Sequence, residues 1–182
     1  CCTGSCPTRG WAPGEFSLLS PHSALVALVD PPATASFCVQ PQGADAKVRR
    51  ASTLVDFSPT AAFYIDDNDL ATFDAADFAA MVSAWEVTIF PVVSATFGPP
   101  MDVDENGRVI VAFSSAIGTS GMVGYFDWPD ALPPQDTSPD CSVSGRNSAD
   151  VIFLNTPATL QGAPFNLAPA QALANLQGTL AH

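Results

Sequence analysis

A run of apolar residues at helical spacing constrains the fold of this chain most strongly. Its members share one face of an ideal helix: Phe78, Met81, Val82, Trp85, Ile89, Val92 and Val93. This periodicity predicts a long amphipathic helix that packs one face on a core. We expect Pro91 to kink the helix or to split off its last turn, because proline lacks the N–H that an interior turn requires. Gly98-Pro99-Pro100 should end the helix.

Strand-like runs surround this helix. Three of them, at 61–65, 108–113 and 149–154, are short, apolar and bounded by polar or glycine-rich stretches. A closing helix is predicted from Pro169, with Leu173, Leu176 and Leu180 at helical spacing. This order of elements predicts an α+β or α/β core of roughly 120 residues.

The chain divides into three parts. Residues 1–15 are rich in Gly, Pro and Cys and are predicted to form a flexible tether. Residues 16–57 carry short apolar runs between prolines, which is typical of a small β-rich lead-in. Residues 58–182 hold the long helix and the three strands. Their closing helix reaches His182 with no C-cap signal, so we expect the natural chain to continue.

Charge and hydropathy exclude several classes of partner. Eighteen acidic residues against six basic ones give a net charge of −12. Nucleic acids are excluded because Lys and Arg must neutralise their phosphates, and an anionic membrane surface is excluded as an electrostatic partner. Apolar residues make up 47% of the chain, which is enough for a sizeable core. No apolar run approaches the ~18 residues that span a bilayer, so no transmembrane segment is expected.

Five cysteines indicate a compartment that permits disulfides. They stand at Cys1, Cys2, Cys6, Cys38 and Cys141, and none forms a Cys-x-x-Cys pair of the zinc-ribbon or thioredoxin type. One hypothesis is a bacterial lipoprotein that carries its lipid on Cys1, which leaves four cysteines and three disulfide pairings. The alternative is that the sequence begins at a cysteine by chance. Under both, we predict an exported protein, extracellular or at the cell surface.

One polar motif resembles part of a calcium site. Asp102, Asp104, Asn106 and Gly107 match the first half of an EF-hand loop, in which oxygens at alternate positions bind calcium. The twelfth position should be a bidentate Glu and is Phe113, so the EF-hand interpretation fails. A plain polar turn or a weak calcium site remains.

Other motifs select no catalytic group. The glycine-rich stretch 118–124 lacks the Lys of a phosphate-binding loop. A Ser-His-Asp triad would need His22 or His182. The spacing of the aspartates selects no pair for acid–base chemistry, and most are expected in solvated loops. These aspartates are Asp66, Asp67, Asp69, Asp102, Asp104, Asp127, Asp130 and Asp150.

The stretch Thr179-Leu-Ala-His182 resembles the approach to the His-Glu-x-x-His motif of zincin metallopeptidases. In that motif two His side chains on one helix face bind Zn²⁺, and the Glu activates the bound water. The resemblance extends upstream and covers about residues 60–182. Its pieces keep the order found in the hyicolysin-type family of secreted bacterial zincins: Phe63–Asp67, Asp102–Ile110, Gly124–Phe126, Asn147–Asp150 and Leu154-Asn155.

The resemblance implies a fold and a set of site residues. It implies an α+β fold, in which the β-rich lead-in is followed by the upper half of a zincin-like domain. That half has a mixed β-sheet and a long helix and ends at the start of the active-site helix. His182 corresponds to the first zinc ligand, and the general-base Glu and the second His would follow it. No catalytic residue therefore lies within the 182 residues. The backbone of the strand at Ala149, Asp150, Val151 and Ile152 is expected to pair with an extended peptide substrate.

Two main hypotheses follow. The first is the amino-terminal portion of a secreted zinc metallopeptidase that acts on a peptide or protein substrate and is inactive as a 182-residue fragment. The alternative is a non-enzymatic, acidic, exported surface lipoprotein or binding module. A third hypothesis, a carbohydrate-acting or calcium-binding domain, predicts that calcium stabilises the chain.

Overall fold

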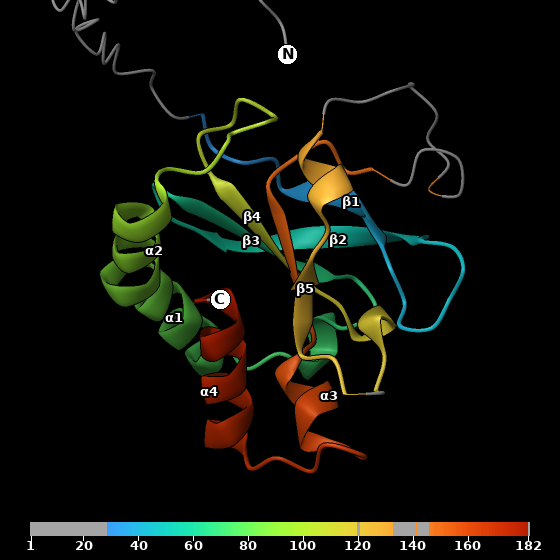
Figure 1. Ribbon diagram of the computed structural model, residues 1–182. Coiled ribbons are helices and arrows are strands. Elements are labelled where there is room, and N and C mark those ends of the chain that lie inside the picture. Colours follow the sequence, from blue (N-terminus) through green and yellow to red (C-terminus); the bar gives the residue numbers. More distant parts are fainter. Residues whose placement is uncertain (1–28, 120, 133–140, 142–145, 182) are drawn as a thin grey trace, which may run out of the picture.

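A computed structural model describes residues 29–119, 121–132, 141 and 146–181, which form a six-stranded sheet with its α-helices packed on one face (Figure 1). The strands are β1 (Thr34–Val39), β2 (Val48–Phe57), β3 (Ala61–Asp66), β4 (Val109–Phe113), β5 (Gly124–Phe126) and β6 (Val151–Leu154). Their order across the sheet is β1-β2-β3-β4-β6-β5. The predicted α+β class is confirmed.

The sheet is mixed. β1, β2 and β3 pair antiparallel, β3, β4 and β6 pair parallel, and β5 runs antiparallel to β6. Parallel neighbours need a crossover connection, and the helical run between β3 and β4 supplies one. The predicted strands at 61–65 and 108–113 are confirmed to within one residue. The third begins at Val151, two residues after its predicted start.

The N-terminal part of the described chain belongs to the same sheet. The second half of β2 pairs with β3, from Ser52 opposite Asp66 to Phe57 opposite Ala62. The predicted boundary between residues 57 and 58 therefore falls between two paired strands. The predicted tether at 1–15, with Cys1, lies outside the described residues, as does the lead-in as far as residue 28.

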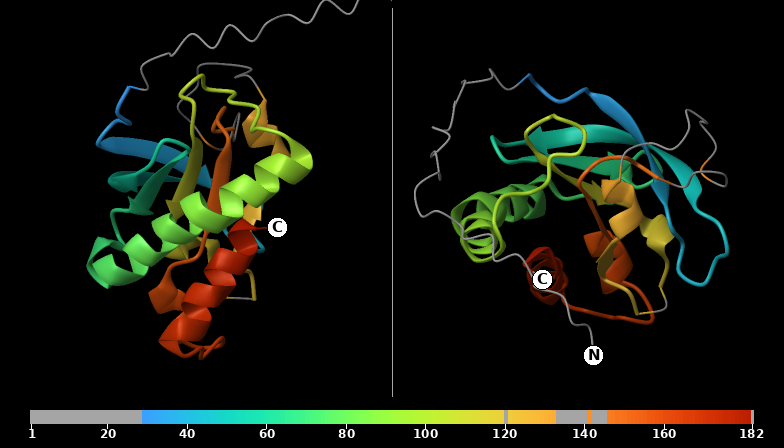
Figure 2. Two further views of the ribbon diagram at one scale, coloured as in Figure 1. Left: turned by 90° about the vertical axis from the view of Figure 1, so that its left-hand side faces the viewer. Right: turned by 45° about the horizontal axis from the view of Figure 1, so that its top comes forward.

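The predicted long helix forms as one continuous run that lies across the sheet (Figure 2, left). It comprises α1 (Ala75–Ala84), a π-helical turn η2 (Trp85–Ile89) and α2 (Phe90–Phe97). Asp74 caps its start, because its side chain accepts a hydrogen bond from the backbone N–H of Ala76 at 2.7 Å. Gly98 ends it with a φ of 94°, a conformation that glycine adopts without strain.

Pro91 does not split off the last turn, because a wider turn accommodates it. In a regular α-helix the N–H of residue 91 would donate to the carbonyl of Val87, and proline has no such donor. The π-helical turn immediately precedes it, and there the N–H of Phe90 donates to Trp85, five residues back. The helix thereby continues to Phe97.

The run Ala75–Phe97 is also long and apolar enough to cross a membrane, with 23 residues and a mean hydropathy of 1.5. One such helix is weak evidence, because core helices meet the same criterion. Phe78, Met81 and Trp85 are buried on the sheet side of this helix. The expectation that no segment spans a membrane stays a prediction.

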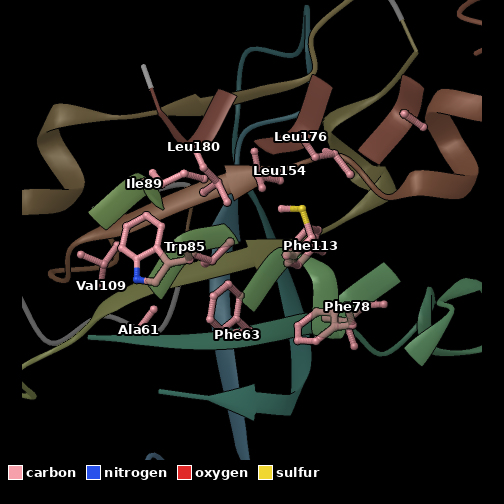
Figure 3. Packing of buried hydrophobic residues seen from close by; sticks show 14 of the residues in the cluster. Ala61, Phe63, Phe78, Trp85, Ile89, Val109, Phe113, Leu154, Leu176 and Leu180 are labelled. Carbon is pink, nitrogen blue, oxygen red and sulfur yellow. The ribbon is translucent and has the colours of Figure 1, made fainter. Parts of the chain in front are cut away.

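Two hydrophobic clusters lie on the two faces of the sheet. Successive residues of a strand point to opposite faces, so Phe63 and Ile65 face the helices while Ala62 and Tyr64 face away from them. Figure 3 shows the helix-side cluster, in which Phe63, Trp85 and Leu176 come from a strand and two different helices. All six residues of β3 are buried, which makes it the centre of the core.

The predicted closing helix is α4 (Pro169–Leu180), and Ala172, Leu176 and Leu180 are its buried positions. Leu173 packs at the margin of the same cluster. The short helix α3 (Pro157–Gln161) precedes it and is capped by the Thr156 side chain. Short 3₁₀ turns complete the described elements: η1 (Leu70–Thr72), η3 (Ser115–Ile117) and η4 (Trp128–Ala131).

Candidate functional site

An apolar cleft of about 660 Å³ lies where α2, β5 and the last turn of α4 meet. Figure 3 shows Trp85, Ile89 and Leu180 close together in the helix-side cluster, and Trp85 and Leu180 also line the cleft. Large exposed side chains border the cleft: Phe97 is 81% exposed, Met101 77% and Phe126 55%. The lining includes Trp85, Phe90, Val93, Pro99, Pro100, Val109, Ile152, Thr179 and Leu180. This surface can bind bulky apolar groups.

Gly124 lets β5 approach both its neighbouring strand and α4. A Cβ atom at this position would lie 2.5 Å from the Phe153 carbonyl oxygen and 2.5 Å from Leu154 Cδ2. It would also lie 3.1 Å from Cγ2 of Thr179 in α4. Glycine within a strand often marks such a close approach of backbone. Gly124 therefore places β5 directly against the end of α4.

Residues 149–152, whose backbone was expected to pair with a peptide substrate, lie inside the sheet. Val151 and Ile152 belong to β6, which lies between β4 and β5 and is paired with both. Asp150 and Ala149 are also engaged: the carbonyl of Asp150 accepts from Ile110 at 2.8 Å, and the N–H of Ala149 donates to Asp130 at 2.9 Å. Among the described strands, β5 is the outer one beside the cleft.

The predicted zinc ligand is not placed, because His182 lies outside the described residues, as does His22. The residues just before His182 are placed: Thr179 and Leu180 form the last turn of α4 and line the cleft. Within the described stretches, no three His, Cys, Asp or Glu side chains are grouped closely enough to hold a metal ion.

The residues of the predicted calcium motif lie in one turn that uses their oxygens internally. Asp102 Oδ1 accepts from the N–H of Gly107 at 2.8 Å, and Asn106 Oδ1 accepts from the N–H of Arg108 at 2.6 Å. Asp104 Oδ2 accepts from the Asn106 side chain. Burial raises the pKa of Asp104, and the nearby carboxylates of Asp102 and Asp150 add to the rise. The turn is thus held together by its own hydrogen bonds.

Four of the eight aspartates are buried, although most were expected in solvated loops: Asp66, Asp69, Asp130 and Asp150. Each accepts hydrogen bonds that hold a loop. Asp150 lines the cleft, and its two oxygens accept from the N–H groups of Asp102 at 2.6 Å and Val103 at 3.4 Å. Asp66 accepts from the hydroxyl of Ser114 at 2.7 Å. These contacts assign the buried carboxylates to the framework of the site.

One disulfide joins described cysteines, Cys38 of β1 and Cys141, with their Cα atoms 5.5 Å apart. With a lipid on Cys1, the four other cysteines allow three sets of disulfide pairings. The 103 residues between Cys38 and Cys141 give no spacing signal that selects this pair. Cys1, Cys2 and Cys6 lie outside the described residues.

Tyr125 of β5 also contributes to the region around the cleft. Its hydroxyl accepts a hydrogen bond from the N–H of Gln40 at 2.7 Å, and its ring stacks on Phe153 with centroids 5.0 Å apart. Burial strongly raises the pKa of the Tyr125 phenol, so it stays neutral. Its role here is to hold β5.

The chain matches no model of a known protein family and no curated protein.

Proposed function

We propose that this chain is the amino-terminal portion of a secreted zinc-dependent metallopeptidase, which in its full-length form hydrolyses peptide bonds. The observation that carries the proposal is the position of Thr179 and Leu180. They line the apolar cleft at the end of α4, and they open the stretch Thr179-Leu-Ala-His182 that resembles the approach to a zincin motif.

The proposed substrate is a peptide or protein segment in an extended conformation. Such a segment can add to the outer edge of a sheet through main-chain hydrogen bonds, and its alternate side chains then point to one face. β5 replaces residues 149–152 in this role, because it is the outer strand beside the cleft. Alternate side chains of a peptide paired with β5 would face the apolar cleft.

The proposed metal is zinc, and His182 is the residue of this chain assigned to it. Catalytic zinc needs three protein ligands and a water, so one imidazole does not complete a site. The general-base Glu and the second His are proposed to follow His182. When bound, zinc supplies an activated water that attacks the peptide carbonyl. The 182-residue chain alone is therefore proposed to be inactive.

Export is part of the proposal, and the disulfide between Cys38 and Cys141 supports it. Disulfides persist in oxidising compartments and are rare in the cytosol. The proposed location is extracellular or at the cell surface. A lipid on Cys1, as in the lipoprotein hypothesis, would anchor the chain at the cell surface.

The same features would serve the alternative, an exported binding module without catalysis. An apolar cleft beside an outer strand binds an extended segment whether or not the segment is cut afterwards. The two functions differ in the requirement for zinc and for His182.

The test compares the 182-residue chain with a chain extended by its native downstream residues. We expect the extended chain to bind one zinc ion, measured by plasma mass spectrometry, and to hydrolyse casein. Its His182→Ala variant should lose both properties, and the matched control His22→Ala should keep both. An extended chain that binds no zinc and leaves casein intact contradicts the peptidase and favours the binding module.

A further inference from the structure

The two outer strands of the described sheet, β1 and β5, are connected to each other by side chains. The sheet curls, so that Phe37 of β1 lies against Phe153 of β6 with ring centroids 6.4 Å apart, although the two strands are not neighbours. Two residues beyond Cys38, the N–H of Gln40 donates to the Tyr125 hydroxyl of β5 at 2.7 Å. The β1 side of the sheet thereby contacts β5 directly.

Lys47 makes a second connection. It precedes β2, and its Nζ lies 2.8 Å from Asp127 Oδ2 and 2.8 Å from Asp130 Oδ1. Asp127 directly follows β5, and the Asp130 side chain is fully buried. Because the Lys47 side chain is only 9% exposed, this ion pair is largely shielded from solvent screening. Lys47 therefore fixes the end of β5 to the turn between β1 and β2.

Asn147 and the disulfide make the third connection. Asn147 Oδ1 accepts from the N–H of Cys38 at 2.7 Å, and its Nδ2 donates to the Cys38 carbonyl at 3.1 Å and to Asp130 Oδ2 at 2.8 Å. The Cys38–Cys141 disulfide crosslinks the same region covalently. We call these residues together the seam: Cys38, Gln40, Lys47, Tyr125, Asp127, Asp130, Cys141 and Asn147.

We propose that the seam holds β5 in place in a redox-dependent manner. The seam opens when a dithiol reduces the Cys38–Cys141 disulfide. A thiolate of the reductant attacks one sulfur of the disulfide and forms a mixed disulfide with it; the S–S bond of the chain breaks, and the other cysteine leaves as a thiolate that takes up a proton. The second thiol of the reductant displaces the attacked sulfur, which leaves two cysteine thiols in the chain and an oxidised, cyclic reductant. Two electrons pass from the reductant to the disulfide.

The physical reason is that the sheet alone holds β5 weakly, so its position depends on contacts with the seam. The strand has three residues and is paired on one side, to β6. The crosslink keeps Asn147 and Asp130 next to Cys38, so their hydrogen bonds form without further loss of chain entropy. Without the crosslink, each polar contact must offset the entropy of ordering its own segment.

Opening the seam should affect β5 and spare the helix-side core. That cluster contains Phe63, Phe113 and Leu176 and includes no residue of the seam. β5 contributes Gly124, Tyr125 and Phe126 to the cleft border, so the border would be ordered in the oxidised chain and loosened in the reduced one. The inference that this loosening controls substrate binding rests on the proposed function. The inference that reduction opens the seam does not rest on it.

The test is hydrogen exchange on the full chain, compared between the oxidised form and a form refolded with dithiothreitol, with thiols counted to verify reduction. We expect the amide of Tyr125 to exchange at least tenfold faster in the reduced chain, because the alternation of the antiparallel ladder makes it the β5 amide that faces β6. Amides of β3 and α4 should keep their rates. A Cys38→Ala/Cys141→Ala chain should exchange as the reduced form does, and its exchange rates should not change when dithiothreitol is added. The matched control Cys2→Ala/Cys6→Ala should respond as the wild type does.

Two results overturn the inference. One is unchanged exchange of the Tyr125 amide on reduction; the other is a loss of protection that extends equally to β3 and α4, which includes failure of the reduced chain to refold. Neither result depends on hydrolysis. Zinc-dependent peptidase activity together with unchanged exchange in β5 would support the proposed function and refute the redox inference. Faster exchange in β5 on reduction, in an extended chain without peptidase activity, would support the redox inference and refute the proposed function.

Discussion

Replacing Gly124 by alanine tests the packing of β5 against its neighbours. The added Cβ would lie 2.5 Å from the Phe153 carbonyl oxygen, whereas ordinary van der Waals contacts of a Cβ begin near 3.4 Å. Backbone cannot yield as a flexible side chain does, so β5 must shift away from β6 and α4. Overpacking of this kind costs about 1–3 kcal/mol. For a chain of this size, that corresponds to a fall in Tm of roughly 2–12 °C.

The assay is thermal unfolding by circular dichroism, with urea denaturation for the free energy. The matched control is Gly178→Ala in α4, where no atom lies within 4 Å of the added Cβ. Inside a helix, alanine is favoured over glycine by about 0.5–1 kcal/mol, so this variant should be more stable than the wild type. Equal or greater stability of Gly124→Ala would refute the close approach of β5.

Three further predictions concern the buried and clustered carboxylates. Asp130→Asn should lower the free energy of unfolding by about 1–3 kcal/mol in urea denaturation, because it removes the fully buried one of the two carboxylates that pair with Lys47 and leaves the ammonium with Asp127 alone; a loss below 1 kcal/mol would show the buried pair to be unimportant. Asp104→Asn should raise Tm at pH 7 and have no effect well below pH 3.8, because a raised folded-state pKa means that the ionised carboxyl is disfavoured by folding, and that cost vanishes once both states are protonated. The reverse order of the two Tm values at pH 7 would contradict it. EGTA should leave Tm unchanged, because Asp102 and Asn106 already accept hydrogen bonds within their turn; a rise in Tm on adding calcium would assign a calcium site there.

The elements that depend on local periodicity were predictable from the sequence. The helical spacing from Phe78 to Val93 and the run at 61–65 both gave the correct element. The missing N–H of Pro91 predicts a break in the helix, whereas the π-helical turn that accommodates Pro91 forms where Trp85 and Ile89 pack on the sheet. That packing is not a local property.

The site was less predictable, because it depends on which strands become neighbours. Nothing in the run 149–154 indicates that it would be paired on both sides, and the three-residue strand β5 has too few residues for a period-two pattern. The pairing of Cys38 with Cys141 and the ion pair of Lys47 with Asp130 join segments far apart in the chain. Gly124 was the one local signal, because a glycine within a strand suggests close approach.

The most direct measurement of the central claim is the sequence of the native protein beyond His182, read by mass spectrometry of its carboxyl-terminal peptides from the source cells. We predict Glu-x-x-His immediately after His182, which would place the two imidazoles on one helix face beside the cleft. Any other continuation, or a native chain of 18.9 kDa that ends at His182, would contradict the metallopeptidase.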